Sequence, residues 1–194
     1  LADTFNSMVT EIRDYAKEMV TLNDAYYRFV PKEFLQHLER ESITEVKLGD
    51  QVQREMSVLF SDIRSFTTIS EALTPKENFN LLNQYLSVVS PVIRQNNGFI
   101  DKYIGDAVMA LFPVSPDHAV VAGIAMQKAL REYNELFRIG MEPIKIGVGI
   151  HTGLLMLGTV GEEKRMEGTV ISDAVNLASR LEGLTKRFGS SILI

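Results

Sequence analysis

The sequence of 194 residues contains no cysteine. Disulfides, thiolate nucleophiles and zinc sites with sulfur ligands are therefore excluded, and a reducing compartment is compatible with the chain. No apolar run approaches the roughly 20 residues that a helix needs to cross a bilayer, and no signal peptide is visible. The net charge is −5, which disfavours a nucleic-acid-binding surface, because such surfaces are usually basic.

What is present is enough for a folded domain. Hydrophobic residues make up 45% of the chain, which is typical of a globular protein with a core. The length fits one domain with an appendage, or at most two small domains. The first residue is Leu1 rather than Met, so we expect the chain to be a fragment with further domains upstream.

The first thirty residues have a coiled-coil pattern. Apolar residues recur there in alternating steps of four and three, at Leu1, Phe5, Met8, Ile12, Tyr15, Met19, Leu22, Tyr26 and Phe29. We expect the helix to end at Pro31, because proline breaks a helix interior. A single amphipathic helix packed on the domain is the alternative. We favour a parallel dimer, because the steps do not drift toward 3.6 residues.

The rest of the chain predicts an α+β fold. After a short helix and polar connector at 31–51, we expect strands at 57–60, 99–103, 107–112, 144–153, 154–161, 165–171 and 191–194, and helices at 74–98, 115–137 and 173–189. The core order is strand, helix, strand, strand, helix, strand. This is the ferredoxin-like βαββαβ arrangement, an antiparallel sheet with helices on one face, and it says nothing alone about function.

Local signals set the expected ends of these elements. Thr74, Pro75 and Glu77 form a capping box with proline at the first helical position. Gly98 is expected to end that helix, and Asp173 to cap the last one. Between 99–103 and 107–112 we expect a tight turn at Ile104 and Gly105.

Two aspartates interrupt or follow apolar runs. Asp62 comes at the end of the first strand, and Asp106 comes just after the hairpin turn, inside FIDKYIGDAVMALF. Neighbouring strands would bring them together, and two close carboxylates repel each other unless a cation lies between them. Hard ions such as Mg²⁺ prefer such ligands, with substrate phosphates completing the shell. For either aspartate alone, the alternative is a turn residue whose side chain accepts hydrogen bonds from the local backbone.

Other polar positions have weaker signals. The residues after Asp62 lead into a helix start, whose free N–H groups attract phosphate, although an ordinary capped start is the common case. Asn176 and Arg180 share a helix face and could grip a sugar and a phosphate, although a solvated polar stripe has the same spacing. We interpret the three histidines as structural: His37, His118 and His151. No hydrolytic triad, P-loop or Rossmann motif is present.

Four blocks together resemble a known family. FSDIRSFT, GFIDKYIGDAVMALF, GVGIHTG and TVISDAVNLASRLEGLT are similar, in order and separation, to the catalytic domain of class III nucleotidyl cyclases over roughly residues 45–194. The sequence is most similar to those of bacterial, particularly cyanobacterial, adenylyl cyclases. The start, LADTFNSM, resembles the end of a HAMP signalling domain. The resemblance implies a signalling coiled coil at 1–30, a transducer or connector at 31–51, and a catalytic domain at 52–194.

The resemblance also implies a metal and phosphate site. Asp62 and Asp106, helped by the Ile63 carbonyl, would hold two divalent ions, Mg²⁺ or Mn²⁺. The phosphate-binding positions are Ser65, Phe66 and Thr67. The family usually runs on beyond the position of Ile194, where a further segment often supplies a lysine to the phosphates. We therefore expect the fragment to be C-terminally truncated and either weakly active or inactive.

The resemblance assigns the remaining roles as well. Asn176 and Arg180 match the pair that orients the ribose and stabilises charge in the transition state, and Lys102 and Thr169 match the two base-reading positions. Adenine presents an acceptor at N1 and a donor at its 6-amino group; lysine can only donate and threonine can accept. Guanine presents the reverse, so ATP is favoured.

The implied activity is adenylate cyclase. The ribose 3′-hydroxyl of ATP would attack the α-phosphate in line, releasing cyclic AMP and pyrophosphate, in a homodimer formed through the catalytic domains and the coiled coil. The implied setting is cytoplasmic, below an upstream sensor or HAMP domain, with a membrane anchor suggested by the HAMP-like start. The alternatives are a catalytically silent signalling module and a guanylyl cyclase, which Lys102 disfavours. A diguanylate cyclase would need a GGDEF-type hairpin, and the sequence DKYIGD does not match one.

Overall fold

The structure is a computed structural model that describes residues 2–138 and 142–194. Its elements in chain order are α1 (Ala2–Tyr26), α2 (Lys32–His37), the 3₁₀ turn η1 (Ile43–Glu45), β1 (Gln51–Ile63), α3 (Phe66–Glu71), α4 (Pro75–Gln95), β2 (Phe99–Ile104), β3 (Ala107–Phe112), α5 (Pro116–Phe137), β4 (Ile146–Glu162), β5 (Arg165–Ile171), α6 (Asp173–Phe188) and β6 (Ile192–Leu193). The predicted α+β fold with a βαββαβ core is confirmed: β1, α4, β2, β3, α5 and β4 follow in that order.

One sheet organises the domain. Its strand order is β2-β3-β1-β4-β5, with β6 paired to β4. All pairs are antiparallel except the short parallel contact of β6 with β4. The stretches 144–153 and 154–161, which we expected to be two strands, form the single 17-residue strand β4. The ladder with β1 continues through Gly153, opposite Met56, so no turn separates them.

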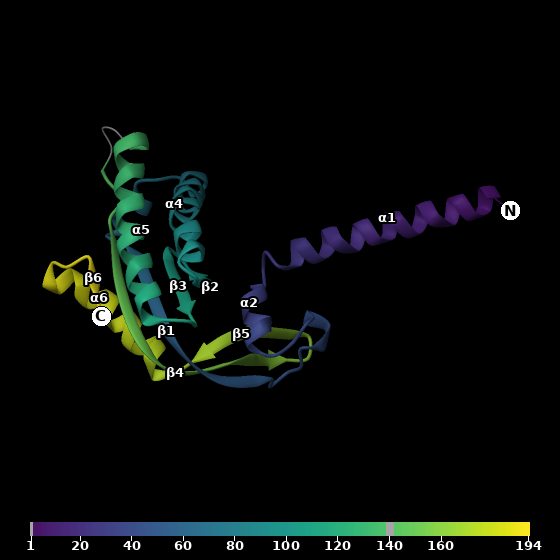
Figure 1. The fold of residues 1–194 in the computed structure, drawn as a ribbon. Helices are drawn as coiled ribbons and strands as arrows, with labels where there is room; N and C mark the ends of the chain where they lie inside the picture. Colours follow the sequence, from purple (N-terminus) through teal and green to yellow (C-terminus); the bar gives the residue numbers. More distant parts are fainter. Residues whose placement is uncertain (1, 139–141) are drawn as a thin grey trace.

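The helices cover both faces of this sheet. Since successive side chains of a strand point to opposite faces, Val148 and Ile150 join the core cluster under α4 and α5, while Gly147 and Gly149 face α6. Figure 1 shows α4 and α5 lying side by side. The two helices of the predicted core therefore share one face, and α6 is an additional helix on the other.

Glycine lets α6 lie directly on the sheet. A Cβ added to Gly149 would lie 2.2 Å from the Ala178 carbonyl oxygen and 2.2 Å from the Glu182 backbone nitrogen. Both atoms belong to the helix backbone, which cannot give way as a flexible side chain can. The position of α6, and of every side chain that it carries, thus depends on the missing side chain in β4.

The hairpin turn lies one residue later than expected. Ile104 pairs with Ala107, so the two-residue turn is Gly105–Asp106 rather than Ile104–Gly105. Gly105 has φ +64°, a left-handed conformation that costs glycine little. The turn therefore carries Asp106 itself.

Two helix ends also differ from expectation. The capping box at Thr74 is confirmed, but the left-handed residue after α4 is Asn97, with φ +59°, rather than Gly98. Gly98 is needed instead for space, because a Cβ there would lie 2.4 Å from the Phe112 ring. The N-cap of α6 is Ser172, not Asp173. Its extended backbone brings the hydroxyl within 2.9 Å of the Ala174 N–H, which donates to it.

The first helix stands apart from the domain. Figure 1 shows α1 extending away from the sheet, and its heptad side chains are exposed, Met19 to 64% and Leu22 to 60%. The alternative of a helix packed on its own domain is therefore wrong. The helix ends at Tyr26, ahead of Pro31, and residues 27–30 form turns. The first heptad position, Leu1, lies outside the described residues.

Nothing in the described part of the chain covers the apolar stripe of α1, so the coiled coil stays a prediction. Among residues 2–138 and 142–194, no helix has the length and apolarity required to cross a membrane.

The packing of α6 against β4 can be tested with matched substitutions at two glycines. Gly149→Ala should lower the free energy of unfolding by at least about 2 kcal/mol, because its methyl group meets helix backbone. Gly183→Ala, inside α6 with nothing within 4 Å, should instead stabilise by about 0.5–1 kcal/mol through helix propensity. Urea unfolding of both variants measures this, and equal effects of the two would contradict the packing described.

Candidate active site

The two aspartates meet at one backbone amide. Asp62 lies near the end of β1, and Asp106 is the second residue of the hairpin turn. The Ile63 N–H donates to Asp62 Oδ1 at 3.0 Å and to Asp106 Oδ2 at 3.3 Å. The Ile63 side chain is buried in the core, which fixes this amide. The pairing of β1 with β3 thus brings together two carboxylates that are 44 positions apart in the printed sequence.

Burial and mutual repulsion make it unfavourable for both carboxylates to be charged. Burial, then the neighbouring Asp62, raises the pKa of Asp106 to about 7. Burial, with Asp62 as the next cause, also raises the pKa of Glu182 on α6. In the described residues no group of three or more acidic or histidine side chains is placed to hold a metal by itself. Two carboxylates that need a counter-charge fit the coordination of Mg²⁺, which binds proteins through one or two carboxylates and takes its other ligands from substrate phosphates and water.

The loop after Asp62 is held in a strained, fixed shape. Ser65 adopts φ +56° and makes no side-chain capping bond to α3. The Arg64 N–H donates to the Lys145 carbonyl at 2.7 Å. With Ser65 not capping the helix, the N–H groups of Phe66 and Thr67 start α3 without intrahelical acceptors. The three predicted phosphate-binding positions therefore form the start of the short helix α3, which follows Asp62 closely in the chain.

Arg64 ties this loop to α6. Its guanidinium donates to the Thr185 hydroxyl and to the Ser190 carbonyl at 3.4 Å, and lies 3.9 Å from Glu182. Sequence reasoning missed this contact, because no local pattern pairs residues so far apart in the chain. The loop and the helix consequently form one unit.

The second group of polar side chains joins opposite ends of the sheet. Lys102 lies in β2 and Thr169 in β5, the two terminal strands of the order β2-β3-β1-β4-β5. The sheet curls so far that Lys102 Nζ lies 3.2 Å from Thr169 Oγ1. Nζ is also 3.3 Å from Glu167 Oε1 and 3.6 Å from Asp101 Oδ2. Sequence reasoning selected Lys102 and Thr169 but missed both carboxylates.

The third group faces solvent. Ala174 and Ala178 are the buried face of α6, and Asn176 and Arg180 are exposed. In the part of the chain that the structure describes, no hydrogen bond or ion pair engages either side chain. They therefore point away from their own sheet, and this single chain brings them to neither the aspartates nor Lys102.

These features define a class of protein. Solved nucleotidyl cyclase domains share this antiparallel βαββαβ fold. Residues 48–188 match the model of the adenylate and guanylate cyclase catalytic domain. The chain belongs to this family, so the predicted family is confirmed. The HAMP-like start remains a prediction.

Individual relatives are similar over much of the chain. An adenylate cyclase of Anabaena cylindrica is 42% identical over 200 residues, covering 100% of this chain and 40% of the relative. The chain thus spans less than half of that protein. A bacterial light-regulated adenylyl cyclase has a TM-score of 0.82 at 25% identity, covering 95% of this chain and 55% of that one. The guanylyl cyclase Cya2 has a TM-score of 0.63 at 38% identity, covering 71% and 72%.

The carboxylate pair predicts that the free energy of unfolding depends on pH when a chelator removes divalent ions. Because the folded protein holds the Asp106 proton more tightly than the unfolded chain, stability should fall as pH rises from about 4 to about 7. Asp106→Asn should flatten this slope and stabilise the protein at pH 8 by about 1 kcal/mol at most, since the pair is partly exposed and screened by solvent. Denaturant unfolding in EDTA measures both. A variant less stable than wild type at pH 8 would contradict the repulsion.

Proposed function

We propose that this chain is the catalytic domain of an adenylate cyclase, which converts ATP to 3′,5′-cyclic AMP and pyrophosphate. The observation that carries the choice of ATP is the 3.2 Å contact between Lys102 Nζ and Thr169 Oγ1. It presents a cationic donor and a hydroxyl side by side. That pattern complements the N1 acceptor and the 6-amino donor of adenine.

The aspartate site would serve the triphosphate. Asp62, Asp106 and the Ile63 carbonyl would hold two divalent ions, Mg²⁺ or Mn²⁺. When bound, the ions would lower the pKa of the ribose 3′-hydroxyl and neutralise the triphosphate. The N–H groups at the start of α3, from Ser65 to Thr67, would donate to phosphate oxygens.

The reaction is an in-line displacement at the α-phosphorus. The ribose 3′-oxygen forms a bond to the α-phosphorus and loses its proton, while the bond from that phosphorus to the bridging oxygen of the β-phosphate breaks. Pyrophosphate leaves with the bonding electrons. Asn176 would orient the ribose, and Arg180 would stabilise the negative charge of the transition state.

A second copy of the chain would complete the site. Asn176 and Arg180 are exposed and face away from their own sheet, so a nucleotide bound at the aspartates of one chain would need such a helix face from a partner. We therefore propose a homodimer with two equivalent sites. The domain boundaries 1–30, 31–51 and 52–194, and an upstream sensor that acts through α1, are part of the same proposal.

Guanylyl cyclase activity is the second candidate, because a guanylyl cyclase is among the similar structures. The Lys102 ammonium argues against it. Guanine presents a donor at N1 and an acceptor at O6, so a side chain that only donates would leave N1 facing another donor.

The direct test supplies ATP or GTP with Mg²⁺ or Mn²⁺ and quantifies cyclic nucleotide. We expect cyclic AMP from ATP, at least about tenfold more than cyclic GMP from GTP. Asp62→Ala should lower the rate by about 100-fold or more, since several kcal/mol of charge stabilisation would be lost.

Each outcome of this assay has a distinct meaning. Cyclic GMP as the main product would overturn the base assignment. No product from a folded dimer that binds ATP, even when the chain is extended to the protein's natural C-terminus, would favour a silent signalling module.

The coiled coil has its own test. Met19 and Leu22 are exposed heptad positions, and replacing both with Asp should place like charges in the dimer seam. The midpoint of activity against protein concentration should then rise by about tenfold or more. Analytical ultracentrifugation should show a matching loss of dimer. Asp substitutions at Lys17 and Thr21, off the seam, are the control. No difference between the two pairs of substitutions would sink the coiled-coil proposal.

A further inference from the structure

A bulge in β2 sets the residue before Lys102 apart from the ladder. Ile100 pairs with Ala110 and Lys102 pairs with Met109, so Asp101 is an extra residue opposite no partner. A bulge of this kind changes the direction of the side chains around it. Here it brings a carboxylate and an ammonium from adjacent residues toward each other, which a regular strand would direct to opposite faces.

The Asp101 carboxylate is buried without a hydrogen bond. Its side chain is 2% exposed, and Oδ2 has no hydrogen-bond partner among the described residues. Its separation from Lys102 Nζ, 3.6 Å, is an ion-pair distance longer than a hydrogen bond. Burial raises its pKa to about 6, and Lys102 opposes that rise. A carboxylate in this position costs stability.

A second carboxylate touches the same ammonium from a different setting. Glu167 Oε1 is 3.3 Å from Lys102 Nζ, but its side chain is 63% exposed. The exposed glutamate can leave the contact at little cost, because water replaces the lysine. Asp101 is fixed by its burial and by the strand. Of the two acids, Asp101 is therefore the one that can hold the ammonium in a constant place.

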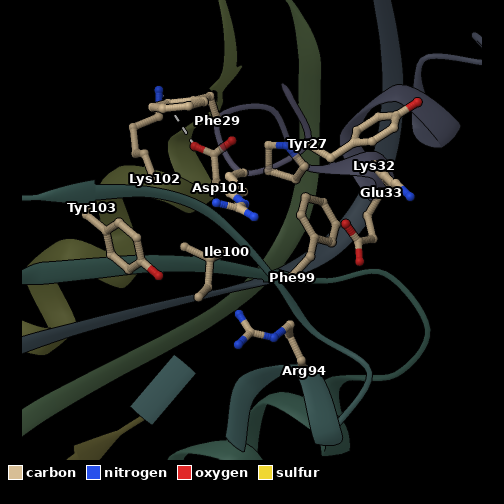
Figure 2. A pocket seen from close by; sticks show the side chains of 12 residues that line it. Tyr27, Phe29, Lys32, Glu33, Arg94, Phe99, Ile100, Asp101, Lys102 and Tyr103 are labelled. Atoms are coloured by element: carbon tan, nitrogen blue, oxygen red, sulfur yellow. Dashed lines mark ion pairs between the residues drawn. The ribbon is translucent and has the colours of Figure 1, made fainter. Parts of the chain in front are cut away.

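The lysine has space to move if it is not held. Lys102 and Asp101 line a cavity of about 750 Å³ between β2 and the segment that joins α1 to α2. In Figure 2 the Asp101 carboxylate points to the Lys102 ammonium, with the Phe29 ring beside them. Arg94 lies on another wall of this cavity. A lysine has four rotatable bonds and a flexible stem, so an unheld ammonium would sample this cavity instead of staying beside Thr169.

We propose that Asp101 is a positioning residue for base recognition: it holds the Lys102 ammonium directed at Thr169. A nucleotide would then meet a donor and an acceptor in fixed register, without an ordering cost at each binding event. This inference rests on the proposed function, since it assigns a role to the base-reading pair of that same site.

The experiment compares Asp101→Asn with Glu167→Gln, each of which removes one carboxylate charge from the same ammonium. The ratio of kcat/KM for ATP to that for GTP should fall by about tenfold in Asp101→Asn, mainly through a higher KM for ATP. In Glu167→Gln it should change by less than about twofold. Thermal unfolding should show both variants folded.

A double-mutant cycle separates positioning from a general structural effect. In a Lys102→Met background, Asp101→Asn should change the ratio no further, because its action passes through the lysine. Additive losses, or an unchanged ratio in Asp101→Asn alone, would overturn the proposal.

Equilibrium binding of ATP and GTP to the same variants, in Ca²⁺, gives a readout that does not need turnover. If wild type binds ATP preferentially but makes no cyclic AMP, the proposed function fails and the binding ratios still decide the role of Asp101. If wild type binds both nucleotides equally, the proposal for Asp101 is overturned.

Discussion

The antiparallel ladder between β1 and β4 is the interaction on which the site depends. It runs from Gln51, opposite Gly158, to Ile63, opposite Ile146. At one end β1 delivers Asp62 next to the hairpin. At the other end β4 pairs with β5 and so carries Thr169. Between these ends, the glycines of β4 seat α6 and with it Asn176 and Arg180. Asp106 and Lys102 are placed instead by the pairing of β1 with β3 and of β3 with β2, so β1 is common to both halves of the site.

Several features of the chain are unfavourable in isolation. The Asp62–Asp106 pair is a repulsion, the Asp101 carboxylate is buried without a hydrogen bond, and α1 exposes an apolar stripe. Natural sequences are locally consistent, and departures concentrate where function demands them. Each departure belongs to a part of the proposed function: cation and phosphate binding for the aspartates, the position of the Lys102 ammonium for Asp101, and a second helix for α1. The unfavourable features thus lie where a ligand or a second chain would bind.

Local signals in the sequence were sufficient for much of the fold. The capping box at Thr74 and the apolar runs around the hairpin set the order of the core, because caps and periodicity act within a few residues. The predictions were wrong where a contact between residues distant in the chain determined the local structure. Gly98 is required by the Phe112 ring rather than by the helix end, and β4 remains one strand through Gly153 because β1 pairs with it. Both facts depend on residues far away in the chain.

The same distinction applies to the candidate site. Lys102 and Thr169 were selected through the family resemblance, but the contact between opposite ends of the sheet was not visible in any local pattern. Glu167 and Asp101 were missed for that reason. A carboxylate next to a lysine in an alternating strand would be expected on the opposite face, and only the bulge between Ile100 and Lys102 brings the two together. Bulges have no reliable sequence signal here, because Asp101 is neither a glycine nor part of a turn.

Overall similarity is a poor guide to the choice between ATP and GTP. Identity is 42% to an adenylate cyclase and 38% to a guanylyl cyclase over most of the domain. The fold is common to both kinds of enzyme, and the proposed metal site would serve both substrates, since the triphosphate and ribose are common to them. The two bases differ only in which edge atoms donate and which accept, so discrimination must come from a few side chains with fixed donors and acceptors. A flexible lysine is a weak discriminator unless something buried fixes it. We therefore expect the choice between ATP and GTP to depend on residues behind the proposed base-reading pair as much as on the pair itself.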